Sequence, residues 1–188
     1  LGNKFLSHIR EVDAIVEVVR CFEDKNIIHV DGNVDPIRDI EVINLELIFS
    51  DLEIIDNRIN KIAKKAQTSK NKDDLIEYNL LLRIKENLEK NIPARKLEFE
   101  EEELKILSSF RLITAKPIIY VANVDEDTIM AGENEYVKEV REYAKKENTE
   151  VVMICAKIES ELAELELEEK TAFLKELGIE ESGLASLI

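Results

Sequence analysis

Asn123 and Glu126 are residues whose types and spacing could recognise a ligand. They follow the apolar run Ile118-Ile119-Tyr120-Val121-Ala122 and are separated by Val124 and Asp125. The amide of Asn123 can both donate and accept hydrogen bonds, whereas the Glu126 carboxylate can only accept, so together they could meet the edge of a purine base. Most Asn-x-x-Glu tetrapeptides are plain turns, and that alternative stays open at this point.

The spacing matches the base-recognition motif N-K-x-D of GTPases, but this chain reads Asn123-Val124-Asp125-Glu126. In N-K-x-D the aspartate accepts hydrogen bonds from the N1–H and the 2-amino group of guanine. Adenine has no 2-amino group, and its N1 is an acceptor that would face the carboxylate. Glu126 is one methylene longer than aspartate, and Val124 replaces the lysine. Losing a hydrogen bond in a buried site costs about 1–3 kcal/mol, so the departure predicts a changed base preference.

Three apolar runs are expected to form the strands that position these residues. Ile118–Ala122 is apolar without alternation, which is typical of a parallel strand covered on both faces. Residues 13–21 and 150–155 are β-branched runs that each end in a polar loop, and both are predicted to form buried strands. Because ligands bind at the carboxyl ends of parallel strands, we expect the three strand ends to share one edge.

The loops after the other two runs add candidate residues at that edge. Phe22 follows the first run and is placed to lie against a planar base, although a core plug is the alternative. His29 lies further along the same loop, where a solvated loop residue is the alternative. Cys155, Ala156 and Lys157 follow the last run and form a turn that can aim backbone N–H groups at a base.

A long helical segment separates the first two strands. Asp35 is a good N-cap and Pro36 fits the first helical position, which predicts a helix running to about Thr68. A return helix is predicted over 73–91, and the turn between them is short and polar. Both helices carry apolar seams that predict an antiparallel coiled-coil hairpin. The first seam is Leu45, Ile48, Leu52, Ile55, Ile59, Ile62 and Ala66; the second is Leu75, Tyr78, Leu81, Ile84 and Leu88.

Further helices are predicted over 100–115, 134–148, 161–177 and 180–188. The acidic residues from Glu159 to Glu169 are interpreted as a solvated face, and no metal site is predicted in this chain. Amphipathic spacing supports the first two of these helices, and Gly178 is expected to stop the third.

Composition limits the classes of protein. The chain has 188 residues, is 45% hydrophobic and 36% charged, and carries a net charge of −15. This charge argues against general attraction to nucleic acid or membranes. The two cysteines are far apart in sequence, so a reducing cytosol is the simplest setting. No apolar run approaches the length of a transmembrane helix.

The end of the predicted hairpin, over residues 57–72, departs from this acidic background because it holds no acidic residue. Such a basic tip could contact phosphate, or its cations could merely favour a helix C-terminus. The basic residues of the tip are Arg58, Lys61, Lys64, Lys65, Lys70 and Lys72.

Several longer motifs occur in order along the chain, and together they resemble the Obg-like ATPase family, also called YchF. They are Leu1-Gly2-Asn3-Lys4-Phe5-Leu6, Val19-Arg20-Cys21-Phe22-Glu23-Asp24, Val34-Asp35-Pro36-Ile37-Arg38-Asp39-Ile40-Glu41, Asn123-Val124-Asp125-Glu126 and Cys155-Ala156-Lys157-Ile158-Glu159.

The resemblance implies an α/β, parallel-sheet P-loop domain of GTPase type with an inserted helical hairpin. The nucleotide-binding domain would comprise residues 1–34 and 113–188, and the hairpin residues 35–112. It also implies preference for ATP over GTP and a role at the ribosome, where the basic tip could contact ribosomal RNA. The protein is expected to be cytoplasmic and monomeric. Asn123 would meet the adenine edge, and Phe22 and Val124 its faces. Glu126 and the turn of Cys155, Ala156 and Lys157 complete this base site, and His29 would help to orient the attacking water.

The chain contains no G-x-x-x-x-G-K-[ST] phosphate loop. The resemblance places that loop and the Mg²⁺ ligands upstream of Leu1, and a small TGS domain after Ile188. We therefore expect these residues alone to bind ATP poorly and not to hydrolyse it, because phosphate contacts supply most of the affinity and the transition-state stabilisation. The alternatives are an Obg-type GTPase with a relaxed base site and a non-catalytic coiled-coil binding module.

Overall fold

The computed structural model describes residues 1–24, 33–68, 72–179 and 181–187. The chain divides into two compact units. The helical unit comprises Leu1–Ile15 and Glu41–Pro117, and the sheet unit comprises Val16–Ile40 and Ile118–Ile188. The first fifteen residues thus group with the helices, whereas sequence analysis assigned them to the nucleotide-binding domain.

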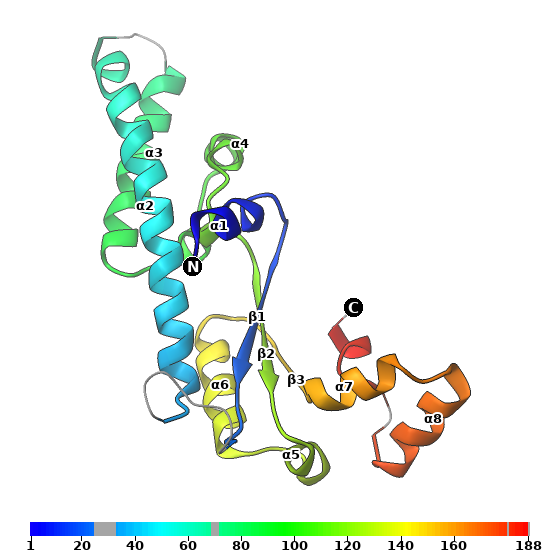
Figure 1. Ribbon diagram of the computed structural model, residues 1–188. Helices are drawn as coiled ribbons and strands as arrows, with labels where there is room; N and C mark the ends of the chain where they lie inside the picture. Colours follow the sequence, from blue (N-terminus) through cyan, green and yellow to red (C-terminus); the bar gives the residue numbers. More distant parts are fainter. Residues whose placement is uncertain (25–32, 69–71, 180, 188) are drawn as a thin grey trace. The chain divides into compact units, whose positions relative to one another are not determined.

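Helices and short 3₁₀ turns build the helical unit (Figure 1). The long helix α2 begins as predicted, since the Asp35 carboxylate accepts a hydrogen bond from the Arg38 backbone N–H at 3.0 Å. The elements are α1 (Asn3–Ile9), α2 (Pro36–Thr68, from Glu41 onward in this unit), α3 (Lys72–Glu89), η1 (Ala94–Lys96), α4 (Glu101–Phe110) and η2 (Ile113–Ala115).

Helices α2 and α3 lie side by side in opposite directions (Figure 1). Ion pairs join them in opposite sequence order: Arg58 pairs with Glu77, Lys65 with Asp74, and Lys85 with Asp56. Their shared core contains much of the predicted seam. Its buried residues from the two helices are Ile48, Ile55, Ile62, Leu80, Leu81, Ile84 and Leu88.

The seam prediction was wrong at Leu75, whose exposed fraction is 51%. The preceding residue, Asp74, is buried instead, and its carboxylate accepts a hydrogen bond from Lys65 at 2.8 Å. Neighbouring helical positions are about 100° apart, so a turn that buries Asp74 against α2 directs Leu75 away from it.

The predicted helix over 100–115 ends earlier, at Phe110, because Arg111 adopts the left-handed conformation with φ 51°. The chain then forms the η2 turn, where the backbone N–H groups of Ile113 and Thr114 donate to the carboxylate of Asp51 on α2. These long-range hydrogen bonds replace those that a continued helix would have made.

The sheet unit consists of a three-stranded parallel sheet and several helices. The strand order is β1-β2-β3, and β2 pairs with β3 so that Tyr120 lies beside Val151 and Asn123 beside Ile154. The elements are β1 (Ile15–Arg20), β2 (Ile118–Asn123), α5 (Glu126–Ala131), α6 (Glu135–Lys146), β3 (Val151–Ile154), α7 (Ala156–Ala163), α8 (Leu167–Glu176) and η3 (Ala185–Leu187).

The core of the sheet unit explains why β2 is apolar from Ile118 to Ala122. Tyr120, Val121 and Ala122 are buried, and α6 packs against β2 and β3. Val137 and Val140 of α6 are fully buried. Strand β1 differs, since Val16 and Val18 are exposed and the described residues leave that face uncovered. The prediction of a buried first strand was therefore wrong at Val16 and Val18, although Val19 is buried.

Two predicted C-terminal helices also differ from the structure. The segment expected to be helical over 161–177 forms two helices, because Glu166 starts α8 as an N-cap and exchanges capping hydrogen bonds with Glu169. Gly178 ends this region with φ 71°, as expected from its freedom to adopt the left-handed conformation. Within the described part of 180–188, only Ala185–Leu187 is helical, as a 3₁₀ turn.

Candidate functional site

The carboxyl ends of the three strands meet at one edge of the sheet, as predicted. The backbone N–H of Cys21 donates to the Asn123 carbonyl oxygen at 2.8 Å. The N–H of Val124 donates to the Ile154 carbonyl oxygen, also at 2.8 Å. The parallel register therefore brings together loops that begin about 100 and 30 residues apart in the chain.

A pocket of about 520 Å³ lies at this edge. All seven residues predicted to contact a base line it: Phe22, Asn123, Val124, Glu126, Cys155, Ala156 and Lys157. Glu23, Asp24 and Asp125 line it as well, and sequence analysis had not assigned them to the site. The volume lies in the range that small-molecule sites occupy.

Asn123 joins two walls of the pocket. Its side-chain Oδ1 accepts a hydrogen bond from the Ala156 backbone N–H at 3.0 Å, which ties the turn after β2 to the turn after β3. Its Nδ2 group has no hydrogen-bond partner within the described part of the chain. The hydrogen bond to Oδ1 thus fixes the orientation of the Asn123 amide. Its Nδ2 group remains available to donate to an acceptor atom on a ligand.

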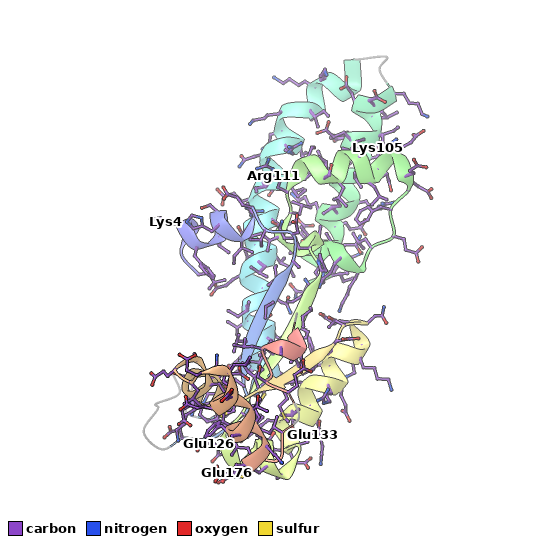
Figure 2. All side chains as sticks on the ribbon, turned by 90° about the vertical axis from the view of Figure 1, so that its right-hand side faces the viewer. Lys4, Lys105, Arg111, Glu126, Glu133 and Glu176 are labelled. Atoms are coloured by element: carbon purple, nitrogen blue, oxygen red, sulfur yellow. The ribbon has the colours of Figure 1, made fainter. Side chains whose placement is uncertain are left out.

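Glu126 is the first residue of α5, and its carboxylate pairs with the Lys157 ammonium on α7 at 3.0 Å. Figure 2 labels Glu126 among the side chains of the sheet unit. The pKa of Lys157 is raised by its hydrogen bond to Glu126 and by the negative charge of that carboxylate. Both partners remain partly exposed, at 40% for Glu126 and 67% for Lys157, so a ligand in the pocket can reach them.

Asp125, which lies between the two motif residues, serves the backbone. Its carboxylate accepts a hydrogen bond from the Thr128 N–H at 2.9 Å and so caps α5. Only Val124 and Asp125 therefore separate β2 from α5, which begins at Glu126. This capping fixes the direction in which the next residue, Glu126, leaves the backbone.

The Phe22 wall is held by residues that sequence analysis did not assign to the site. The Arg20 guanidinium lies 4.9 Å from the Phe22 ring centroid, and its Nε donates to the Phe22 carbonyl oxygen at 3.0 Å. Phe22 itself is half-buried, so it is not the core plug that was the alternative. The stacked guanidinium holds the ring at the pocket, because cations are attracted to aromatic faces.

Two side chains near the start of α6 hold the same loop. Asn134 Nδ2 donates to the Cys21 carbonyl oxygen at 2.7 Å, and Tyr136 Oη donates to the Glu23 carboxylate at 2.8 Å. The hydrogen bond to Glu23 raises the pKa of Tyr136. Asn134 is recognisable from sequence as a helix N-cap, but nothing local indicates that its amide reaches Cys21.

Several predicted residues contribute less than expected or lie outside the described residues. Val124 and Cys155 border the pocket, but their exposed fractions are 2% and 3%, which leaves little of either for a ligand to touch. His29 falls in 25–32, outside the described residues, so its role stays a prediction.

Burial and the nearby Glu139 raise the pKa of Cys21 to about 12, which keeps that thiol neutral and unreactive.

The described residues hold no group of three or more His, Cys, Asp or Glu side chains placed to bind a metal ion. In the same described part of the chain, no helix combines the length and apolarity needed to cross a membrane.

Comparison with known proteins places the chain in a family, although no family model matches it. It is 57% identical over 189 residues to the ribosome-binding ATPase YchF of Bacillus subtilis, and 46% identical over 188 residues to that of Haemophilus influenzae. A solved structure of the Schizosaccharomyces pombe YchF GTPase superposes with a TM-score of 0.88 at 32% identity. Each match covers 100% of this chain and 51% of the other protein, so the chain spans about half the length of these relatives. The chain belongs to the YchF family.

Proposed function

We propose that the pocket binds the adenine end of ATP, and that this chain is the base-recognition half of an ATPase that acts at the ribosome. The observation that carries the proposal is the meeting of Phe22, the Asn123–Glu126 turn and the 155–157 turn around one pocket. An aromatic wall, an Asn123 amide donor without a partner among the described residues, and nearby backbone suit a planar heterocycle. The names of the bacterial relatives, which are ribosome-binding ATPases, support the same function.

The charges around the pocket favour a base over a phosphate as its occupant. Glu23, Asp24, Asp125 and Glu126 line it, against the single lysine Lys157. A triphosphate placed here would meet like charges, so the phosphates must extend away toward groups that neutralise them. In the proposed protein a phosphate loop supplies those groups and Mg²⁺ supplies charge neutralisation during phosphoryl transfer. The residues of this chain hold and orient the base, and His29 is proposed to help orient the water.

GTP is the second candidate, because the solved structure of the S. pombe relative is described as a GTPase. The contact made by the Glu126 carboxylate distinguishes ATP from GTP as the ligand. In this structure its carboxylate is occupied by Lys157, whereas guanine recognition needs a carboxylate that accepts from N1–H and the 2-amino group. A binding module without catalysis is the remaining alternative, and absence of turnover would favour it.

The proposal is tested by hydrolysis of ATP and GTP in competition, using the full-length protein that contains this chain, with Glu126→Asp alongside. We expect ATP to be preferred, and the preference to weaken in the variant by about fivefold or more, since one discriminating hydrogen bond is worth about 1–3 kcal/mol. Preference for GTP would identify an ordinary GTPase, and no turnover of either would favour the binding module. As a control, the 188 residues alone should show no turnover.

We further propose that residues 35–112 form an inserted antiparallel coiled-coil hairpin, whose basic tip contacts ribosomal RNA, and that the protein works as a monomer in the cytoplasm. Both cysteines are free thiols, which suits a reducing compartment.

Several cations of the hairpin tip have acidic partners: Arg58 pairs with Glu77, Lys65 with Asp74 and Lys72 with Glu102. Lys61 and Lys64 are exposed as well, and Lys61 is the better candidate for phosphate contact, while Lys70 lies outside the described residues.

A further inference from the structure

The Glu126–Lys157 ion pair links two elements that border the proposed base site. Glu126 begins α5 after β2, and Lys157 is the second residue of α7 after β3. Their 3.0 Å contact lies between side chains that both line the pocket. Glu126 stands where the N-K-x-D motif has the aspartate that binds guanine. The ion pair therefore engages the carboxylate that would otherwise be available to the base.

An unpaired carboxylate here would favour guanine. It accepts hydrogen bonds only, so it attracts the N1–H and the 2-amino group of guanine and repels the N1 lone pair of adenine. An ammonium group in contact with that carboxylate weakens both the attraction of guanine and the repulsion of adenine. Its charge is opposite in sign and lies about as close to the base as the carboxylate does. With Lys157 in place, the edge of the pocket no longer presents a net negative acceptor to the base.

The Asn123–Ala156 hydrogen bond acts in the same direction. The Ala156 N–H donates to Asn123 Oδ1 at 3.0 Å, so this backbone donor is already used. The 6-oxo group of guanine needs a donor at the pocket edge, whereas the 6-amino group of adenine brings its own N–H. The Ala156 N–H is therefore not available to the 6-oxo group of guanine, while Asn123 Oδ1 keeps a second lone pair that can accept from the 6-amino group of adenine.

We propose that Lys157 is a specificity-determining residue, which holds the Glu126 carboxylate in an ion pair and so prevents it from accepting hydrogen bonds from guanine. This inference rests on the proposed function, since it assumes that a purine nucleotide occupies the pocket. The length of the glutamate side chain alone does not supply this cause of discrimination against guanine. In the proposal, Lys157 of the neighbouring turn keeps the Glu126 carboxylate away from the base.

The test uses the full-length protein that contains this chain and measures equilibrium affinity for ATP and GTP by competition against one labelled nucleotide. Lys157→Met keeps most of the aliphatic chain and removes the charge, whereas Lys157→Arg keeps the charge. We expect the methionine variant to lower the ratio of the GTP to the ATP dissociation constant by about fivefold, equivalent to about 1 kcal/mol. The arginine variant should keep the original ratio.

A double variant shows whether the effect passes through Glu126. If Lys157 acts by withholding the carboxylate, then Lys157→Met combined with Glu126→Gln should lose the gain in GTP binding. An unchanged ratio in Lys157→Met would overturn the inference, as would a gain that persists without the Glu126 carboxylate. Equal loss of both nucleotides in Lys157→Met would overturn it too, because Lys157 would then contribute to binding without discriminating.

The same measurements separate failure of the inference from failure of the proposed function. If the unsubstituted protein binds neither ATP nor GTP, the proposed nucleotide site is wrong and the inference falls with it. If it binds ATP normally and only the expected change in Lys157→Met is missing, the nucleotide site stands and the role of Lys157 is wrong.

Discussion

At the scale of single residues, neighbouring carboxylates in this chain have different roles. Asp125 caps α5, whereas its neighbour Glu126 pairs across the pocket with Lys157. Asp51 is a stronger example, since it is fully buried at 0% exposure. Its carboxylate accepts hydrogen bonds from Arg10 Nη1 at 2.6 Å, from Thr114 Oγ1 at 2.7 Å and from two backbone N–H groups.

Replacing Asp51 by Ala should destabilise the protein by about 3–5 kcal/mol, because it leaves Arg10 and buried backbone donors without their partner. The measurement is urea unfolding followed by circular dichroism, where the midpoint falls and the slope stays the same. Asp56→Ala is the matched control on the same helix. Its ion pair with Lys85 is partly exposed to solvent, so its loss should cost much less than the loss of Asp51. Equal effects of the two substitutions would contradict the role assigned to Asp51.

At the scale of elements, tight packing at the end of β3 explains a glycine that sequence patterns did not single out. A Cβ atom added at Gly183 would lie 2.4 Å from Ile154 Cγ2 and 3.1 Å from the Met153 carbonyl oxygen. The Gly183 N–H also donates to Glu159 on α7 at 2.7 Å. The segment after α8 thus packs closely on the strand that leads into the pocket turn.

Gly183→Ala should lower stability by about 1–3 kcal/mol, because the added methyl overpacks against Ile154 and the backbone. Thermal unfolding of this variant is compared with that of Gly2→Ala, a control at a position where an added Cβ meets nothing within 4 Å. Combining Gly183→Ala with Ile154→Ala removes the clashing Cγ2 atom, so the two losses should be less than additive. Full additivity would show that the close contact does not cause the loss.

At the scale of the whole molecule, charge is distributed unevenly along an acidic chain. The net charge is −15, yet the segment from residue 57 to 72 carries only basic charges. General attraction to nucleic acid is unfavourable for such a chain, so any contact with ribosomal RNA must be local and sensitive to salt. Among the basic residues of the tip, Lys61 is the clearest candidate for contact with RNA. It is exposed and has no ion pair within the described residues.

Reversing the charge of Lys61 and Lys64 to glutamate in the full-length protein should weaken ribosome co-sedimentation several-fold at low salt, with a smaller difference at high salt. Lys145 and Lys146 provide the control, since both are exposed on α6 and their reversal changes the net charge equally. Similar losses from both pairs would indicate a general charge effect. Unchanged co-sedimentation of the Lys61 and Lys64 variant would exclude the tip as the contact.

Local sequence patterns determined much of the fold. Asp35 and Pro36 predicted the start of α2 because capping depends on residues within one turn. The run Ile118–Ala122 predicted the central strand, because only a strand covered on both faces tolerates unbroken apolar residues. From these strands alone, the parallel topology also predicted that Phe22, the Asn123–Glu126 turn and the 155–157 turn would share an edge.

Only the tertiary structure decided which atoms in those turns meet. Asn123 Oδ1 binds the Ala156 N–H, Glu126 binds Lys157, and Asn134 binds the Cys21 carbonyl, each across at least one intervening element. The end of α4 at Arg111 likewise depends on a carboxylate sixty residues earlier, Asp51. Periodicity and capping act over a few residues, so they determine helices and strands. Hydrogen bonds between distant segments depend on how the strands pair and the helices pack, and these contacts decide what the pocket can recognise.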